Sequence, residues 1–124
     1  MLNEDLDSYS RIDLDLIEEL KFALEDGLPD LFRIFLDDAP KRVDIIKKAI
    51  AEENYNEVRK AGHTLSGGGA TFGAGKLAKL CEKISIACKN NCDKDTLLDI
   101  VANLEKELHE LSKELVVILN ELEG

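Results

Sequence analysis

Apolar residues recur every three or four positions along most of this chain. That spacing is typical of helices with one buried face, and no strand-length run alternates β-branched with polar residues. Only two prolines interrupt the pattern. The sequence therefore predicts an all-α protein, built as an antiparallel up-down four-helix bundle with an additional short N-terminal helix laid against it.

Capping residues, glycine and proline divide the pattern into helices. Ser10 and Asp13 resemble a capping box that begins the first helix, and Gly27 would end it. The second helix begins near Leu28. Its apolar phase continues through Pro40, which favours one kinked helix over two separate ones.

The third helix is predicted over about residues 54–70, with Asn54 and Glu57 as its N-terminal cap. A loop around residues 73–75 leads to a fourth helix, whose inward positions are Leu77, Leu80, Cys81, Ile84 and Cys88.

The last helix is the longest, and its apolar positions alternate in steps of four and three. This heptad seam packs either against neighbouring helices of the bundle or against a second copy of the chain. It comprises Leu97, Val101, Leu104, Leu108, Leu111, Leu115, Ile118 and Leu122.

The length and the net charge of the chain exclude several classes of protein and partner. A chain of 124 residues predicts one domain, residues 1–124. The net charge of −10 would repel a phosphate backbone, so DNA and RNA are excluded as partners. No apolar run approaches the roughly 20 residues of a membrane span. The acidic start, M-L-N-E-D-L-D, lacks a signal-peptide core, so we expect a cytoplasmic protein without membrane contact.

The cysteines Cys81, Cys88 and Cys92 are odd in number and accompany no secretion signal, which predicts reduced thiols. Cys88 and Cys92 are four residues apart, but no third ligand lies nearby in the sequence. Zinc binding is therefore a remote alternative, and we expect no metal site.

Residues 58–81 stand out because they contain His63 and no Asp or Glu, although acids outnumber bases 26 to 16 in the chain. At about 100° per residue, His63 lies about 140° from Val58 and about 160° from Leu65. The imidazole is therefore expected on an exposed face, opposite a buried stripe made of Val58, Gly62, Leu65, Gly69 and Phe72.

Small and basic residues surround this histidine. Gly67, Gly68 and Gly69 each cost roughly 0.5–1 kcal/mol relative to alanine inside a helix. Either a partner approaches the backbone there, or the glycines mark the end of the helix; the spacing leaves both open. The bases of the segment, expected to form a positive flank, are Arg59, Lys60, Lys76 and Lys79.

Other motifs in the sequence give weaker evidence for a function. A phosphate loop would need glycine and Ser or Thr where the chain has Ala70 and Leu77. His109 lies among glutamates of the last helix and is expected to be a plain surface histidine. No Ser–His–Asp or Cys–His set has a spacing that compels a nucleophilic triad.

One motif strongly resembles the signature of histidine-containing phosphotransfer (HPt) domains. It comprises His63-Thr64-Leu65-x-Gly67, Phe72-Gly73-Ala74, Leu77 and Cys81. The upstream run F-L-D-D-A-P-K-R, residues 35–42, is similar to the family's second helix, so the resemblance covers roughly residues 28–84. It implies a helical bundle that relays phosphoryl groups between receiver domains in two-component signalling.

By this resemblance, His63 is the phosphoacceptor and Gly67 leaves room for the active-site loop of a receiver. The family has a lysine three positions after the histidine, where this chain has Ser66. Arg59 or Lys60, one turn earlier, could supply the missing cationic contact. The binding residues that we expect around the histidine are Arg59, Lys60, Ser66, Gly67 and Ala70.

The implied function is to accept a phosphoryl group from a receiver aspartate and to pass it to another receiver. A histidine with the reference pKa of about 6.5 is mostly neutral, and hence nucleophilic, near pH 7. We expect a phosphoryl carrier rather than an enzyme, without a cofactor of its own, because the receiver supplies Mg²⁺. The expected partners are response-regulator receiver domains and a hybrid sensor histidine kinase, and the expected state is a monomer. The alternatives are a bundle that docks a receiver without transfer, or a coiled-coil-type helical adaptor.

Overall fold

The computed structural model of the chain describes Leu6 and residues 9–124. All regular elements in this part of the chain are helices, which confirms the all-α prediction. None of the described helices combines the length and the apolarity that crossing a membrane requires. The expectation that the acidic start contains no signal peptide falls on residues 1–7. Of these, only Leu6 belongs to the described residues.

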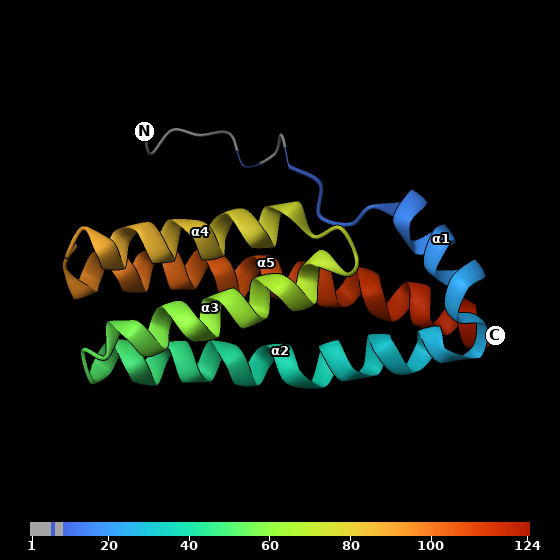
Figure 1. Cartoon of the computed structure of the whole chain (residues 1–124), viewed down its shortest axis with the longest axis horizontal. Coiled ribbons are helices and arrows are strands. Elements are labelled where there is room, and N and C mark those ends of the chain that lie inside the picture. The colour runs from blue at the N-terminus through green and yellow to red at the C-terminus, as the bar shows by residue number, and fades with distance from the viewer. Residues whose placement is uncertain (1–5, 7–8) are drawn as a thin grey trace.

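Four of the described helices form the bundle, and they run alternately in opposite directions (Figure 1). Each of them packs against the next along the chain, and the last packs back against the first. The shorter helix α1 (Leu14–Leu24) lies across one end, near the C-terminus (Figure 1). The bundle helices are α2 (Leu28–Ala51), α3 (Tyr55–Ala70), α4 (Gly75–Lys89) and α5 (Lys94–Glu123).

The start of α1 differs from the prediction. Asp13 is the N-cap, and its side chain accepts hydrogen bonds from the backbone N–H groups of Asp15 and Leu16. Ser10 takes no part in this cap, so the expected capping box is wrong. The hydroxyl of Ser10 instead donates to the carbonyl of Gly73, at 3.3 Å, because the preceding segment lies against the α3–α4 turn.

We call residues 9–13 the N-terminal strap. Its backbone makes two hydrogen bonds with the α3–α4 turn: Lys76 N–H donates to Ser10, and Asp13 N–H donates to Phe72. Gly73 has a φ of 71°, and a Cβ there would overlap Asp13. Glycine at this position therefore permits both the left-handed turn and the close approach of the strap.

The boundaries of α2 and α3 agree with the pattern of the sequence. Helix α2 continues through Pro40 as one helix. Asn54 caps α3 by accepting a hydrogen bond from the backbone of Glu57. Helix α3 then ends at Ala70, so the three glycines form its last turn, which agrees with the interpretation of the glycines as the helix end.

Two of the three glycines are explained by packing within the chain. A Cβ on Gly68 would lie 3.2 Å from the ring of Phe35 on α2. A Cβ on Gly69 would lie 2.8 Å from Leu77 on α4. A Cβ on Gly67 would meet nothing within 4 Å. Gly68 and Gly69 therefore let α3 approach its neighbours, and only Gly67 leaves bare backbone facing outward.

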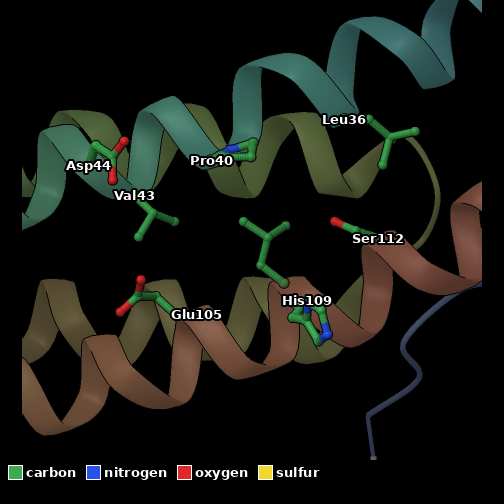
Figure 2. A pocket seen from close by; sticks show the side chains of 8 residues that line it. Leu36, Pro40, Val43, Asp44, Glu105, His109 and Ser112 are labelled. Atoms are coloured by element: carbon green, nitrogen blue, oxygen red, sulfur yellow. The ribbon is translucent and has the colours of Figure 1, made fainter.

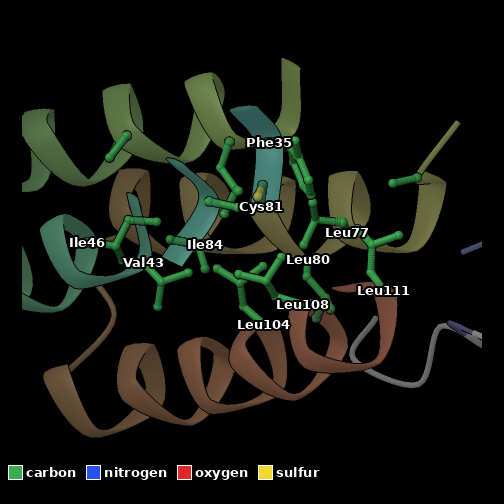
Figure 3. Packing of buried hydrophobic residues seen from close by; sticks show 14 of the residues in the cluster. Phe35, Val43, Ile46, Leu77, Leu80, Cys81, Ile84, Leu104, Leu108 and Leu111 are labelled. Atoms are coloured by element: carbon green, nitrogen blue, oxygen red, sulfur yellow. The ribbon is translucent and has the colours of Figure 1, made fainter. Parts of the chain in front are cut away.

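The core continues from this contact along the bundle (Figure 3). Phe72, just beyond α3, is fully buried and makes edge-to-face contacts with Phe32 and Phe35, at centroid distances of 4.9 and 5.4 Å. All predicted inward positions of α4 are buried. The aromatic cluster and the α4 stripe thus fix both sides of α3.

The seam of α5 is buried inside the chain as far as Leu115. Beyond that residue, Leu119 is buried, whereas Ile118 and Leu122 are only partly buried and lie beside α1. A straight helix has 3.6 residues per turn, so a strict heptad stripe drifts around its axis. Ile118 and Leu122 still pack against the hydrophobic core, so the predicted seam continues to its end with less complete burial there.

The sequence does not indicate that an acidic residue, Glu107, is buried beside the apolar seam of α5. Glu107 on α5 is 5% exposed and forms a two-pronged ion pair with Arg11 of the N-terminal strap, with N–O distances of 2.8 and 2.9 Å. Arg11 also contacts Glu114, and Lys76 lies 3.9 Å from Glu107. Hydrogen bonds to the two glutamates raise the pKa of Arg11. The strap is thus held by charge at one face of the bundle.

We expect Gly69→Ala to be less stable than Gly67→Ala. A methyl group at Gly69 would press on Leu77 and Ala74, which costs about 1–3 kcal/mol. At Gly67 the gain in helix propensity of roughly 0.5–1 kcal/mol meets no such cost. Urea unfolding of the two variants checks this, and equal or greater stability of Gly69→Ala would contradict the packing explanation.

We expect Arg11→Met to lower the free energy of unfolding by about 1–3 kcal/mol, because it deprives the buried Glu107 of its main partner. The control is Lys41→Met, which removes an exposed pair with Asp37 and should change stability by less than about 0.5 kcal/mol. Adding Glu107→Leu to Arg11→Met should recover stability. Equal losses in Arg11→Met and Lys41→Met would show that the strap ion pair has no special weight.

Candidate functional site

His63 lies on α3 with its side chain exposed, as the sequence predicts. Val58 and Leu65, on the opposite face of the same helix, are fully buried and fix its orientation. Within the part of the chain that the structure describes, no hydrogen bond or ion pair holds the imidazole. The ring is therefore accessible to a molecule approaching from outside.

The histidine lines a groove of about 320 Å³ between α3 and α4, which we call the His63 groove. Its apolar and small lining residues are Val58 and Gly62 from α3 and Ala78 from α4. The polar and titratable side chains that line it are Arg59, His63 and Ser66 from α3, and Cys81, Glu82 and Ser85 from α4.

The two basic neighbours of His63 occupy different surfaces. Arg59 lines the His63 groove, is partly buried, and donates from Nη2 to Oδ1 of Asn56 at 2.6 Å. Lys60 is exposed and is not among the groove residues. Its backbone carbonyl accepts a hydrogen bond from the hydroxyl of Thr64. The structure thus separates two residues that the sequence left equivalent.

The expected positive flank is smaller than the sequence suggests. Lys76 turns toward Glu107 on α5, at 3.9 Å. Lys79 lies 3.5 Å from Glu82 and also over the ring of Tyr9, 5.7 Å from its centroid. Neither lysine lines the His63 groove. Only Arg59 and Lys60 of the four bases remain near the histidine.

The surround of His63 is also not free of acids. Glu82 lies one residue beyond the acid-free segment, and the packing of α4 on α3 brings it into the His63 groove. Its pairing with Lys79 offsets part of its charge. Cys81 adds no charge near neutral pH, because burial raises the pKa of its thiol to about 12. Among the described residues, the groove therefore holds one cation, Arg59, and one anion, Glu82, besides the histidine.

Residues that sequence reasoning missed come from α4. Ala78, Glu82 and Ser85 are spaced i, i+4 and i+7 and line the His63 groove beside the buried stripe of α4. A helical wheel of α4 would place them on one face. It could not indicate that this face meets α3 at His63, because that depends on how the two helices pack.

The remaining expected binding residues lie on the outward face of α3. Lys60, His63, Gly67 and Ala70 are all exposed and follow one another in steps of three and four residues. They form a continuous surface, which we call the outward stripe. Ser66 is partly buried and belongs to the His63 groove instead. The candidate residues thus divide into a groove set and a stripe set that share only His63.

His109, the second histidine of the chain, lies on a different surface from His63. His109 is exposed on α5 and borders a hollow of about 380 Å³ between α2 and α5, where Asp44 and Glu105 also lie (Figure 2). This hollow is lined from α2 and α5, without a residue of α3. His109 therefore has no structural link to the His63 groove.

The cysteines are free, and Cys81 and Cys88 are buried. Burial is the largest cause of the raised pKa of Cys88, and the charge of Arg59 opposes it in part. Among the described residues, no group of three or more His, Cys, Asp or Glu is placed to hold a metal ion.

The site combines an exposed imidazole, bare backbone one turn further on and a single guanidinium beside it. A neutral imidazole nitrogen can attack an electrophile presented from outside. The absence of a Cβ clash at Gly67 leaves space for the molecule that presents it. The arrangement is suited to exchange of a small group with another macromolecule, rather than to enclosing a substrate.

Comparisons with solved structures support this fold. HptB of Pseudomonas aeruginosa PAO1, a histidine-containing phosphotransfer protein, superposes with a TM-score of 0.81 at 18% identity, over 90% of this chain and 96% of that one. A putative histidine-containing phosphotransfer protein from rice gives a TM-score of 0.79 at 22% identity, over 91% and 83%. The HPT domain of a Shewanella hybrid histidine kinase gives 0.67 at 20% identity, over 97% and 100%.

Sequence comparison identifies the family. No curated protein matches the chain closely. The model of the Hpt domain family matches residues 30–114, which include α3 and most of the other bundle helices. The match covers well over half of the chain and agrees with the motif around His63. The chain therefore belongs to the Hpt domain family, and its role is histidine phosphotransfer in a phosphorelay.

Proposed function

We propose that His63 is the residue that carries the phosphoryl group. The observation that supports this most directly is the exposed imidazole, which no described side chain engages, next to the open backbone of Gly67. The chain accepts the group from an aspartyl phosphate of a receiver domain and passes it to another receiver.

The transfer step forms one bond and breaks one. The lone pair of the unprotonated imidazole nitrogen attacks phosphorus, forming a P–N bond. The P–O bond to the aspartate breaks, and its electron pair leaves with the carboxylate. The proton on the other ring nitrogen then exchanges with water. The return step runs through the same atoms in reverse.

This chain contributes the nucleophile. We propose that the receiver contributes the groups that stabilise the charge on the transferred phosphoryl oxygens. Phosphoryl transfer needs charge stabilisation on the transferred oxygens, commonly from Mg²⁺ and a cation. We assign the Mg²⁺ to the receiver, so that this chain is a carrier without a cofactor. This division of roles suits an exposed histidine, since the partner closes over it.

We propose that the receiver docks on the outward stripe and that the protein acts as a monomer. The α5 seam is covered by the chain's own helices, which removes the main reason to expect a coiled-coil dimer. We propose a hybrid sensor histidine kinase as the source of the phosphoryl group, since the Shewanella domain comes from such a kinase. The cytoplasmic location stays a prediction.

We expect His63→Gln to abolish phosphorylation by a radiolabelled phospho-receiver, because glutamine lacks the nucleophilic nitrogen. His109→Gln is the matched control, since it removes the other histidine from a separate surface, and it should be labelled like the wild type. The measurement is acid-labile label on the protein after gel separation. Equal labelling of wild type and His63→Gln would end the assignment of His63, whereas absence of label from both proteins would favour a bundle that docks without transfer.

We expect Gly67→Arg to slow transfer from the receiver by at least about tenfold while the domain stays folded. The new side chain would project from the outward stripe into the space that the receiver needs, and its Cβ would meet no atom within 4 Å. Initial transfer rates and circular dichroism of the same samples check this, with Gly67→Ala as the smaller substitution. Unchanged transfer by Gly67→Arg would show that the receiver docks elsewhere.

A further inference from the structure

Phosphorylation would change the charge of the His63 groove. A phosphoryl group carries nearly two negative charges near pH 7. The groove already contains the carboxylate of Glu82, and Ser66 and Ser85 bring no charge. A dianion at this position is favoured only if a cation in reach offsets the repulsion.

Arg59 is the cation best placed for this role. It lines the same groove as His63, one turn earlier on α3. Lys60 lies on the outward stripe, and Lys79 is paired with Glu82. Helical side chains lean toward the N-terminal end of their helix, so the ring of His63 leans toward the turn that carries Arg59.

The hydrogen bond that Arg59 makes in this structure can be replaced by a bond to the phosphoryl group. Its Nη2 donates to the neutral amide of Asn56 at the surface, and this takes one of five N–H donors. Hydrogen bonds between a guanidinium and a phosphate are charge-assisted and roughly twice as strong as neutral ones. The side chain also lies on the α4 side of α3, since it lines the groove between these two helices.

We propose that Arg59 is the counter-charge of the phosphoryl group on His63, and that its guanidinium leaves Asn56 to bind the phosphoryl oxygens. The inference rests on the proposed role of His63 as acceptor. Ser66 is small and lies three residues after His63 in the same groove, so a cation introduced there would reach the same oxygens.

The test uses phosphoramidate, which phosphorylates histidine without a receiver. The pH titration of the ³¹P shift of the phosphohistidine reports the second ionisation of its phosphoryl group. A nearby cation favours the dianion and lowers the pKa of that group. We therefore expect Arg59→Gln to lower its acid dissociation constant by about three- to tenfold relative to the wild type.

Two further variants make the test specific. Ser66→Lys in the Arg59→Gln background should restore the wild-type titration. Lys113→Gln removes an equal charge from α5, which does not pack against α3, and should titrate like the wild type. The other titratable groups that line the groove, Cys81 and Glu82, are present in all four proteins.

The outcomes separate the two proposals. Identical titrations of wild type and Arg59→Gln would overturn the role of Arg59 alone. A change in Lys60→Gln, but not in Arg59→Gln, would also overturn it and move the role to the outward stripe. Failure of His63 to become phosphorylated in the wild type would overturn the proposed acceptor, and the inference with it.

Discussion

The close packing at the C-terminal end of α3 is the constraint on which the site depends. Gly68 and Gly69 have no side chains where Phe35 and Leu77 press against the helix. Phe72 then fills the space beyond the last turn. Because α3 is held on two sides, its rotation is fixed, and this rotation places His63 outside while Val58 is buried. The helix tolerates the low propensity of Gly68 and Gly69 because both allow a closer approach of a neighbouring helix.

This packing also determines the charges around the histidine. The segment that is free of acids in the sequence meets Glu82 in space, and two of its lysines turn to other partners. The histidine is left with one guanidinium in its groove and one ammonium on the outward stripe. A surface of this kind suits brief contact with an anionic phosphoryl group, since a strongly basic site would retain the group rather than pass it on.

The N-terminal strap adds an element outside the region that matches the Hpt family, residues 30–114. The strap binds the α3–α4 turn through backbone hydrogen bonds of Ser10 and Asp13, and Arg11 reaches the buried Glu107. The same turn follows the glycines of α3. The strap therefore supports the C-terminal end of α3 through the turn that follows it.

The sequence by itself determined the helices, the inward faces of α3 and α4, and the exposure of His63, because these follow from local periodicity and capping. It also carried the family motif. It did not determine the partner of Glu107, the roles of Gly68 and Gly69, or the cap of α1, which depend on contacts between distant segments. The choice between Arg59 and Lys60 and the position of Glu82 were likewise decided only by tertiary structure. The physical reason is that adjacent positions on one helix are equivalent until a second helix packs against one of them.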